Sequence, residues 1–371
     1  MKEKFYNIAN LIQRFPDSQY YVVFGERSNG KTYSTLEYCL TDYFKRGSEF
    51  AIIRRYQEDL KGKNGASVFN SIVSNKVIEK LSKGKWNGIY YYSRRWYLTF
   101  TNPENPHDKV VDDTPFAYGF ALSDMEHDKS TAYPNIRNIL FDEFITRTGY
   151  MPDEFVIFTN VLSTIIRLRN DVKIFMLGNT VNQYCPYFKE MGLNNVRKME
   201  KGKTDIYTYG DSGLKVVVEY SDFPQKKKKS DVYFAFDNPK LKMITGGAWE
   251  IAVYPHLTPE MKYRPKDVIY HYFIEFENDL LMCEIVKKDD LCFTFIHRKT
   301  TPIKEDDNSI VYCPVTSPEP NYRRKLIKPM TKVDKKIVWF FVHEKVFYQS
   351  NEVGEIVRNY IMWCKTASIE D

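Results

Sequence analysis

The chain has 371 residues, of which 43% are apolar and 27% are charged, and both fractions lie near the averages of globular proteins. These fractions exclude intrinsic disorder as the default state. No run approaches the 18 apolar residues that a membrane-spanning helix needs, and the charged N-terminal stretch lacks the long apolar segment of a signal peptide. A chain of this length exceeds the size at which one hydrophobic core keeps growing, so two domains are expected.

The net charge of +6 is unevenly distributed along the chain. Residues 1–265 carry 38 Lys and Arg against 31 Asp and Glu, whereas residues 266–371 carry 16 against 17. This distribution permits a polyanionic partner without requiring one. The 28 Tyr and 25 Phe suit half-buried strands, and stacking on nucleic-acid bases is the alternative interpretation. The six cysteines show no metal-ligand spacing and predict buried thiols in a reducing cytosol.

In the first part of the chain, predicted strands alternate with predicted helices. Apolar runs predict strands at 20–24, 50–53, 139–141 and 173–177, with helices at 32–45 and 154–168. Residues 85–100 predict a β-meander in which Asn87-Gly88 forms a tight turn. This alternation predicts an α/β domain with a mostly parallel central sheet.

The pattern changes near residue 222. A run of four lysines, 226–229, marks an exposed loop or hinge, and a β-rich pattern of three strands begins near residue 268. The last stretch, 351–364, has helical spacing. The sequence therefore predicts a P-loop domain at 1–222, a linker at 223–265 and a smaller C-terminal α+β domain at 266–371.

The strongest motif follows the first predicted strand and fits G-x-x-x-x-G-K-[ST] without a departure. It consists of Gly25, Glu26, Arg27, Ser28, Asn29, Gly30, Lys31 and Thr32. Its backbone N–H groups would surround the phosphates of ATP, and Lys31 would supply a positive charge for the β- and γ-phosphates. The Thr32 hydroxyl would be a ligand of Mg²⁺.

A second motif supplies the carboxylates that such a loop needs. The strand at 139–141 ends in Asp142 and Glu143. Asp142 would hold Mg²⁺ through water, and Glu143 would orient and deprotonate the attacking water. The adjacent glutamate predicts a P-loop ATPase of the catalytic-glutamate type, which has an additional strand between the two motifs.

Further polar residues lie at strand and helix ends. Asn179 follows the strand at 173–177 and would sense the γ-phosphate or its water, or would simply turn the chain. Arg167 and Arg169 end the helix after Glu143, where arginines act either as arginine fingers or as partners of the helix dipole. Arg27 is the rival for a finger supplied within the same subunit.

Two pairs of arginines are interleaved with aromatic residues, as phosphate-tracking surfaces often are. Arg54 and Arg55 follow the second predicted strand, and Arg94-Arg95 lie in the meander. Arg54 and Arg55 are the predicted nucleic-acid contacts, and a solvated face is the alternative. A basic segment at 323–336 would dock a polyanion such as RNA or an acidic protein face.

The order of these motifs over residues 15–190 resembles the DNA-packaging (encapsidation) ATPases of small short-tailed bacteriophages, which are terminase-like P-loop ATPases. The likeness rests on GERSNGKT, IIRRY at 52–56, the run from 130 to 145 that includes ILFDEF, and IIRLRNDVKIFMLGNT at 165–180. The resemblance implies a homopentameric ring at the portal vertex of an empty capsid, in the host cytoplasm, which drives double-stranded DNA inward on ATP hydrolysis.

The resemblance also implies roles for single residues. The residue matching Arg167 is given in trans to the neighbouring subunit, and the position of Arg54 is a DNA contact that faces the pore. Where relatives carry a lysine, this chain has Gln57, so part of the DNA contact that the resemblance implies is in doubt. The C-terminal domain would be a degenerate ribonuclease-H-like fold that docks to the portal and to a packaging RNA.

Three other functions stay open at this point. The chain could be a helicase-like ATPase, or a docking protein whose ATP site controls assembly. It could also be a terminase with a working two-metal nuclease, for which Glu275, Glu277, Glu284 and Asp289-Asp290 are the candidate acids.

Overall fold

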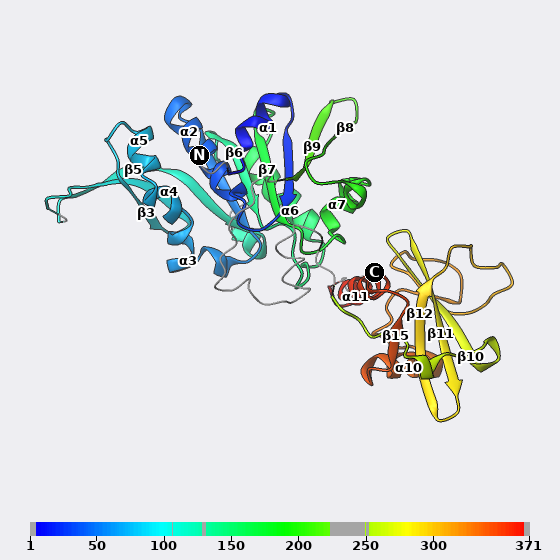
Figure 1. Ribbon diagram of the computed structural model, residues 1–371. Helices are drawn as coiled ribbons and strands as arrows, with labels where there is room; N and C mark the ends of the chain where they lie inside the picture. Colours follow the sequence, from blue (N-terminus) through cyan, green and yellow to red (C-terminus); the bar gives the residue numbers. More distant parts are fainter. Residues whose placement is uncertain (1–4, 106, 128–130, 223–248, 250–251, 367–371) are drawn as a thin grey trace. The chain divides into compact units, whose positions relative to one another are not determined.

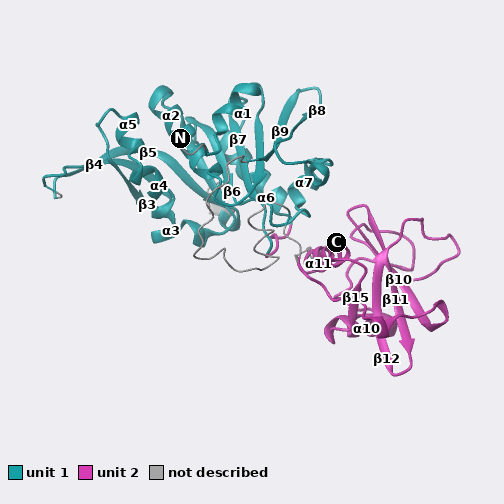
Figure 2. Cartoon of the chain, viewed as in Figure 1, with its two compact units in different colours: residues 1–147, 153–249 teal, residues 148–152, 250–371 magenta. Residues whose placement is uncertain are grey.

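The computed structural model describes residues 5–105, 107–127, 131–222, 249 and 252–366. The chain divides into two compact units, which are residues 1–147 with 153–249 and residues 148–152 with 250–371 (Figure 2). The predicted lysine-rich run at 226–229 lies outside the described residues, so the predicted linker bounds stay a prediction. No described helix is long and apolar enough to cross a membrane.

The first unit is built on one nine-stranded sheet with the order β3-β4-β5-β2-β6-β7-β1-β9-β8 (Figure 1). The six strands from β5 to β9 in this order are parallel, and β3, β4 and β8 add antiparallel edges. The strands span Tyr20–Gly25 (β1), Glu49–Arg54 (β2), Gly88–Tyr92 (β3), Arg95–Thr101 (β4), Lys109–Ala121 (β5), Ile136–Asp142 (β6), Lys173–Asn179 (β7), Thr204–Tyr209 (β8) and Leu214–Ser221 (β9). The predicted mostly parallel α/β sheet is confirmed, and β7 is the additional strand between β1 and β6.

Helices cover both faces of this sheet. They span Ile8–Arg14 (α1), Lys31–Arg46 (α2), Gly62–Ser67 (α3), Asn70–Ser74 (α4), Val77–Leu81 (α5), Glu154–Ile166 (α6) and Pro186–Glu190 (α7), with short 3₁₀ turns at Gln57–Leu60, Leu122–His127 and Val196–Lys198. Because side chains alternate across a strand, Leu140 of β6 joins the core on the α2 face, while Phe141 stacks on Phe158 of α6 with ring centroids 5.1 Å apart. This double coverage explains why the central strands are apolar without alternation.

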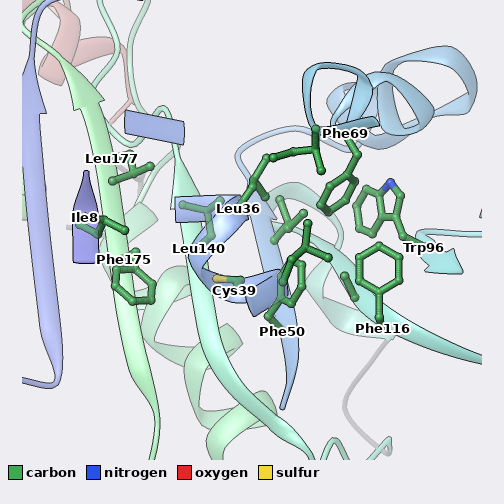
Figure 3. Close-up of a cluster of buried hydrophobic side chains, with 14 of the residues drawn as sticks. Ile8, Leu36, Cys39, Phe50, Phe69, Trp96, Phe116, Leu140, Phe175 and Leu177 are labelled. Atoms are coloured by element: carbon green, nitrogen blue, oxygen red, sulfur yellow. The ribbon is translucent and has the colours of Figure 1, made fainter. Parts of the chain in front are cut away.

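The core on the α2 face is rich in aromatic side chains (Figure 3). Phe69, from the segment between α3 and α4, packs edge-on against Trp96 and Phe116 with ring centroids 5.6 and 5.4 Å away. All three rings are at most 1% exposed. Much of the high aromatic content therefore builds half-buried and buried strands, as predicted from the composition.

One predicted turn is wrong. Asn87-Gly88 does not join two strands, because Gly88 begins β3 and the hairpin pairs Tyr92 with Arg95. The turn is Ser93-Arg94, whose φ values of 48° and 60° are those of a type I′ turn. Such a turn normally takes Asn or Gly, so the sequence carries no turn signal at this place.

The second unit contains a six-stranded sheet with the order β14-β13-β10-β11-β12-β15. Its strands span Val268–Phe276 (β10), Asp279–Lys288 (β11), Leu291–Arg298 (β12), Val311–Tyr312 (β13), Tyr322–Arg323 (β14) and Val346–Tyr348 (β15), and its helices span Lys332–Val342 (α10) and Asn351–Thr366 (α11), with 3₁₀ turns at Pro259–Met261 and Pro265–Asp267. The first three strands form the predicted antiparallel meander, and β13 and β15 pair parallel to β10 and β12. The ribonuclease-H-like fold stays a prediction.

Candidate nucleotide site

The P-loop connects β1 to the N-terminus of α2, so its backbone N–H groups and the positive end of the helix dipole face one point. Gly30 has φ 94° and caps the helix, a conformation that residues with a side chain rarely adopt. Gly25 meets a different constraint, because a Cβ atom there would lie 2.2 Å from the Ser221 hydroxyl at the end of β9. The Asn29 amide donates to the same hydroxyl at 3.1 Å, which ties the loop to β9.

The Lys31 ammonium already points into the loop. Its Nζ atom donates to the Glu26 carbonyl at 2.7 Å, to Asn29 Oδ1 at 3.2 Å and to Asn179 Oδ1 at 3.3 Å. Asn179 reaches this position because β7 pairs with β1 and places it opposite Gly25. The structure thus brings the predicted strand-tip asparagine beside the P-loop, within contact of the lysine.

The two predicted carboxylates lie across from the P-loop at the end of β6. The Thr32 hydroxyl donates to Asp142 Oδ1 at 3.0 Å, so the two predicted Mg²⁺ ligands are adjacent. Arg54, at the end of the neighbouring strand β2, bridges both acids: one terminal nitrogen lies 2.9 Å from Asp142 Oδ2 and the other lies 3.2 Å from Glu143 Oε2. The Asp142 side chain is 8% exposed whereas that of Glu143 is 67% exposed.

Glu143 also has an unusual backbone. Its φ of 62° lies in the left-handed region, which a glutamate adopts only where the surroundings impose it. The conformation turns the chain sharply after β6, so that the side chain of Asp142 is held against Thr32 while that of Glu143 faces solvent. Such strain at a candidate catalytic residue supports a functional interpretation.

The residues present fit a magnesium–nucleotide complex. A pocket of about 440 Å³ is lined by the P-loop, Asp142, Glu143 and Asn179, with Tyr33, Leu36, Val68 and Ile72 forming an apolar side. Hydroxyl and carboxylate oxygens are the ligands that Mg²⁺ prefers, and this ion usually takes only one or two protein ligands besides phosphates and water. The adjacent oxygens of Thr32 and Asp142 meet that requirement.

The prediction that Arg55 contacts nucleic acid is wrong. Its side chain is 7% exposed, and its Nε atom lies 2.9 Å from both carboxylate oxygens of Glu154, at the start of α6. Its terminal nitrogens donate to the carbonyls of Glu143 and Phe144 at 3.2 and 2.7 Å. Burial and the negative charge of Glu154 raise the pKa of Tyr187, whose hydroxyl donates to that carboxylate at 2.8 Å. Arg55 is therefore a buried structural residue that holds the loop after β6 in place.

A DNA contact by Arg54 stays a prediction, and the structure adds a condition to it. Both of its terminal nitrogens are engaged by acids of the candidate site, so a contact with DNA would require these ion pairs to open. Gln57 donates to Asp124 at 2.9 Å, so this side chain is also engaged within the unit. Nothing in the sequence pattern indicated this role of Arg54, because a cation after a strand is common both on exposed surfaces and beside acidic sites.

Arg167 and Arg169 lie at the other edge of the sheet. Arg167 donates to the Thr131 carbonyl at 3.1 Å, and Arg169 donates to the Ile136 carbonyl at 2.6 Å, both at the segment where β6 begins. Asp142 is at the end of β6, six residues further, which is ~20 Å along a strand. An arginine side chain does not span that distance, so neither residue reaches the phosphate site of its own subunit.

The two arginines differ in their surroundings. The Arg169 guanidinium donates to five backbone carbonyls, those of Tyr133, Pro134, Ile136, Ile165 and Ile166, which tie the end of α6 to the start of β6. Burial lowers the pKa of this guanidinium. Arg167 makes the one exposed bond to Thr131 that is described above. Arg169 thus has the contacts of a structural residue, and Arg167 has those of a side chain available for another contact.

Comparison with known proteins shows which proteins the chain resembles. Residues 107–238 match the family model of the podovirus DNA encapsidation protein (Gp16). The chain is 27% identical over 232 residues to the DNA packaging proteins of Bacillus phages phi29 and PZA, which is 62% of this chain and 60% of each relative. Over these residues the chain is similar in sequence to the podovirus DNA encapsidation proteins. The DNA packaging protein of Bacillus phage B103 is 29% identical over 174 residues, covering 46% of this chain and 47% of that protein.

Two solved structures show that the fold extends over the whole homologue. The Phi-28 gp11 DNA packaging motor covers 100% of both chains with a TM-score of 0.53 at 18% identity. The bacteriophage phi29 genome packaging motor assembly covers 96% of both chains with the same TM-score at 19% identity. The sequence likeness to the phi29 and PZA proteins, by contrast, spans 60% of their length.

Proposed function

We propose that this protein is an ATP-hydrolysing motor that moves double-stranded viral DNA into a preformed capsid. The observation that carries the proposal is the constellation at the carboxyl edge of the sheet, where Lys31, Thr32, Asp142 and Glu143 converge from β1, α2 and β6 around one pocket. The names of the homologous phage proteins support the coupling of this site to DNA packaging.

The residues around the pocket have different roles in the proposed hydrolysis. Lys31 and the P-loop N–H groups bind the β- and γ-phosphates, and Thr32 and Asp142 hold Mg²⁺, which neutralises charge on the phosphates when bound. Glu143 orients the attacking water and accepts its proton. Arg54 positions Glu143 relative to Asp142, and Asn179 lies where a polar side chain senses the γ-phosphate. Arg27 remains a secondary candidate in the loop.

Hydrolysis takes place between subunits of a ring. Arg167 lies about one strand length from the phosphate site of its own chain, so its role as a finger requires a neighbouring copy. A homopentamer at the portal vertex, acting transiently on the procapsid in the host cytoplasm, is the proposed assembly. Docking through the second unit to the portal and to a packaging RNA belongs to the same proposal.

A retained nuclease is not favoured. Of the candidate acids, Glu284 is engaged by Tyr263 and by His297, whose Nε2 atom lies 3.5 Å away. Among the described residues, no three His, Cys, Asp or Glu side chains converge in a way that could hold a metal ion. A two-metal mechanism needs several such ligands at one place.

The first test is ATP turnover with added linear double-stranded DNA at several salt concentrations, with Glu143→Gln as the blank. We expect stimulation that fades as salt rises, because phosphate contacts release counterions. Turnover by the Glu143→Gln protein at the wild-type rate would overturn the catalytic assignment. An unwinding assay on a forked duplex separates the proposal from a helicase, because a helicase would unwind the fork. If the ATP turnover of the capsid-bound ring never responds to DNA, the alternative of a docking protein is favoured.

A further inference from the structure

The segment that carries Arg167 is a tight turn of defined type. The Arg169 N–H donates to the Ile166 carbonyl at 3.2 Å, which closes a four-residue turn after α6. Arg167 has φ 53° and ψ −122°, the values of the first central residue of a type II′ turn. Glycine normally takes that position, so an arginine there is strained. The second corner residue of the turn is Leu168.

Leu168 is 99% exposed, more than any other large apolar side chain among the described residues. Single exposed leucines are ordinary on protein surfaces. This one is unusual because the backbone on both sides of it is fixed. The Arg167 N–H caps α6 through the Ser163 carbonyl at 2.9 Å, and Arg169 is held by five carbonyls. Asp171 adds an ion pair to Arg137 at 2.7 Å.

A rigid turn that presents an apolar side chain loses little conformational entropy when it binds. Because Leu168 and Arg167 are the two corners of one turn, a partner that receives one of them also meets the other. The finger reaches a nucleotide only in another copy of the chain, so that copy is the partner. The pocket that the finger would enter has an apolar side, where Tyr33 and Val68 are only partly buried.

We propose that Leu168 is an intersubunit anchor, which packs on apolar surface of the neighbouring copy and seats Arg167 at its phosphate site. This inference rests on the proposed ring with a finger in trans. It assigns different consequences to the two corner residues: Leu168 sets the affinity between subunits, and Arg167 sets the rate once the subunits are joined.

The test is ATP turnover per subunit as a function of protein concentration, with sedimentation velocity on the same samples. For Leu168→Ser we expect the concentration of half-maximal turnover to rise at least about tenfold, the order expected for one leucine left unburied, with an unchanged plateau. Leu168→Met, which keeps the apolar contact, should stay near wild type. Leu291→Ser is the matched control, because Leu291 is an exposed leucine, 42% exposed, in the second unit.

Arg167→Ala should show the opposite pattern, with a lost plateau and assembly at the wild-type concentration. If Arg167→Ala abolishes turnover while Leu168→Ser follows the wild-type concentration curve, the anchor alone is wrong. A lowered plateau for Leu168→Ser at full assembly would also overturn it, since the residue would then act on the rate. If the turnover per subunit of the wild-type protein does not depend on its concentration, the proposed contact between subunits is wrong. The anchor and the ring then both fail.

Discussion

At the scale of single residues, Arg54 is the side chain whose role the structure changes most. Its guanidinium joins Asp142 and Glu143, and its Nε atom is buried without a hydrogen-bond partner. A buried donor without a partner is costly, so this atom does not add to the stability of the folded chain. In the proposed reaction the arginine would hold the general base in place, next to the carboxylate that would bind the metal.

We therefore expect Arg54→Ala to lower kcat at least about tenfold, because misplacing the general base removes an effect of that order or more. Equilibrium binding of ATP should change less than about threefold, since the P-loop contacts remain. Turnover and nucleotide-binding titrations measure the two effects. Arg95→Ala, at an exposed arginine of β4, serves as the control, and an unchanged kcat in the Arg54 variant would contradict the role.

Arg167 offers a second test at this scale, because its backbone and its side chain can be separated. Arg167→Gly relieves the positive φ of 53° and should be more stable than Arg167→Ala by about 1 kcal/mol, which is a few degrees in Tm. Both variants should lose most ATP turnover. Equal melting temperatures for the two variants would show that the turn relaxes in solution.

At the scale of elements, the buried pair of Arg55 and Glu154 joins the end of β2 to the start of α6. The Glu154 side chain is 1% exposed, so removing its partner leaves an uncompensated charge in the interior. Arg55→Ala should destabilise the protein by about 3 kcal/mol or more, measured by denaturant unfolding. Lys61→Ala, which removes an exposed pair with Glu58, should cost less than about 1 kcal/mol.

The double variant Arg55→Met/Glu154→Leu removes both charges and should recover part of that loss. An Arg55→Ala protein that keeps wild-type stability but loses its response to DNA would restore the surface role predicted from the sequence.

The meander of the second unit carries a pH-sensitive pair. The hydrogen bond between Glu284 and His297 lowers the pKa of the glutamate and raises that of the histidine, with Tyr263, His271 and Lys299 as the other titratable neighbours. The pair stabilises folding when both groups are charged. This contribution is complete between the ordinary values of 4.5 and 6.5, and it is lost as pH rises through the raised histidine pKa or falls through the lowered glutamate pKa.

Stability of the second unit should therefore fall by about 1 kcal/mol between pH 6 and pH 9, and His297→Gln should flatten that dependence. Urea unfolding at the two pH values measures it. His343→Gln, at an exposed histidine, should keep the wild-type slope; a slope unchanged in the His297 variant would assign the effect to another group.

At the scale of the whole molecule, the parallel sheet separates the two groups of residues that the proposed reaction needs. The phosphate loop, Asp142 and Glu143 lie where the strands end, and Arg167 lies where β6 begins. In this proposal a single copy holds the residues of a nucleotide site and a finger that cannot reach that site. The proposed division would make assembly a condition of turnover.

Mixing two inactive variants tests that division. Lys31→Ala removes the phosphate contact, and Arg167→Ala removes the finger, so each ring alone should be inactive. Mixed rings contain interfaces with an intact loop from one variant and an intact finger from the other, and they should recover part of the wild-type turnover. Mixtures as inactive as the separate proteins would favour a structural role for Arg167.

The sequence by itself determined the P-loop, the acids after β6 and the positions of the central strands along the chain. These features depend on contiguous residues, whose spacing and apolar runs are visible in one dimension. The contacts of Asn179 followed from the same logic, because the tip of a parallel strand lies beside its neighbour. The hairpin turn at Ser93-Arg94 was not predicted, since neither residue usually takes the positive φ values of such a turn.

Only the tertiary structure decided which arginines form ion pairs with which acidic side chains. Arg54 and Arg55 are adjacent in sequence and look alike, yet alternation along β2 sends one to the site and the other to a buried glutamate 99 residues away. The distance between Arg167 and the phosphates likewise depends on the length of β6 and the return path of α6. Partners far apart in the chain leave no local pattern, because burial and charge pairing are properties of the folded surface rather than of spacing.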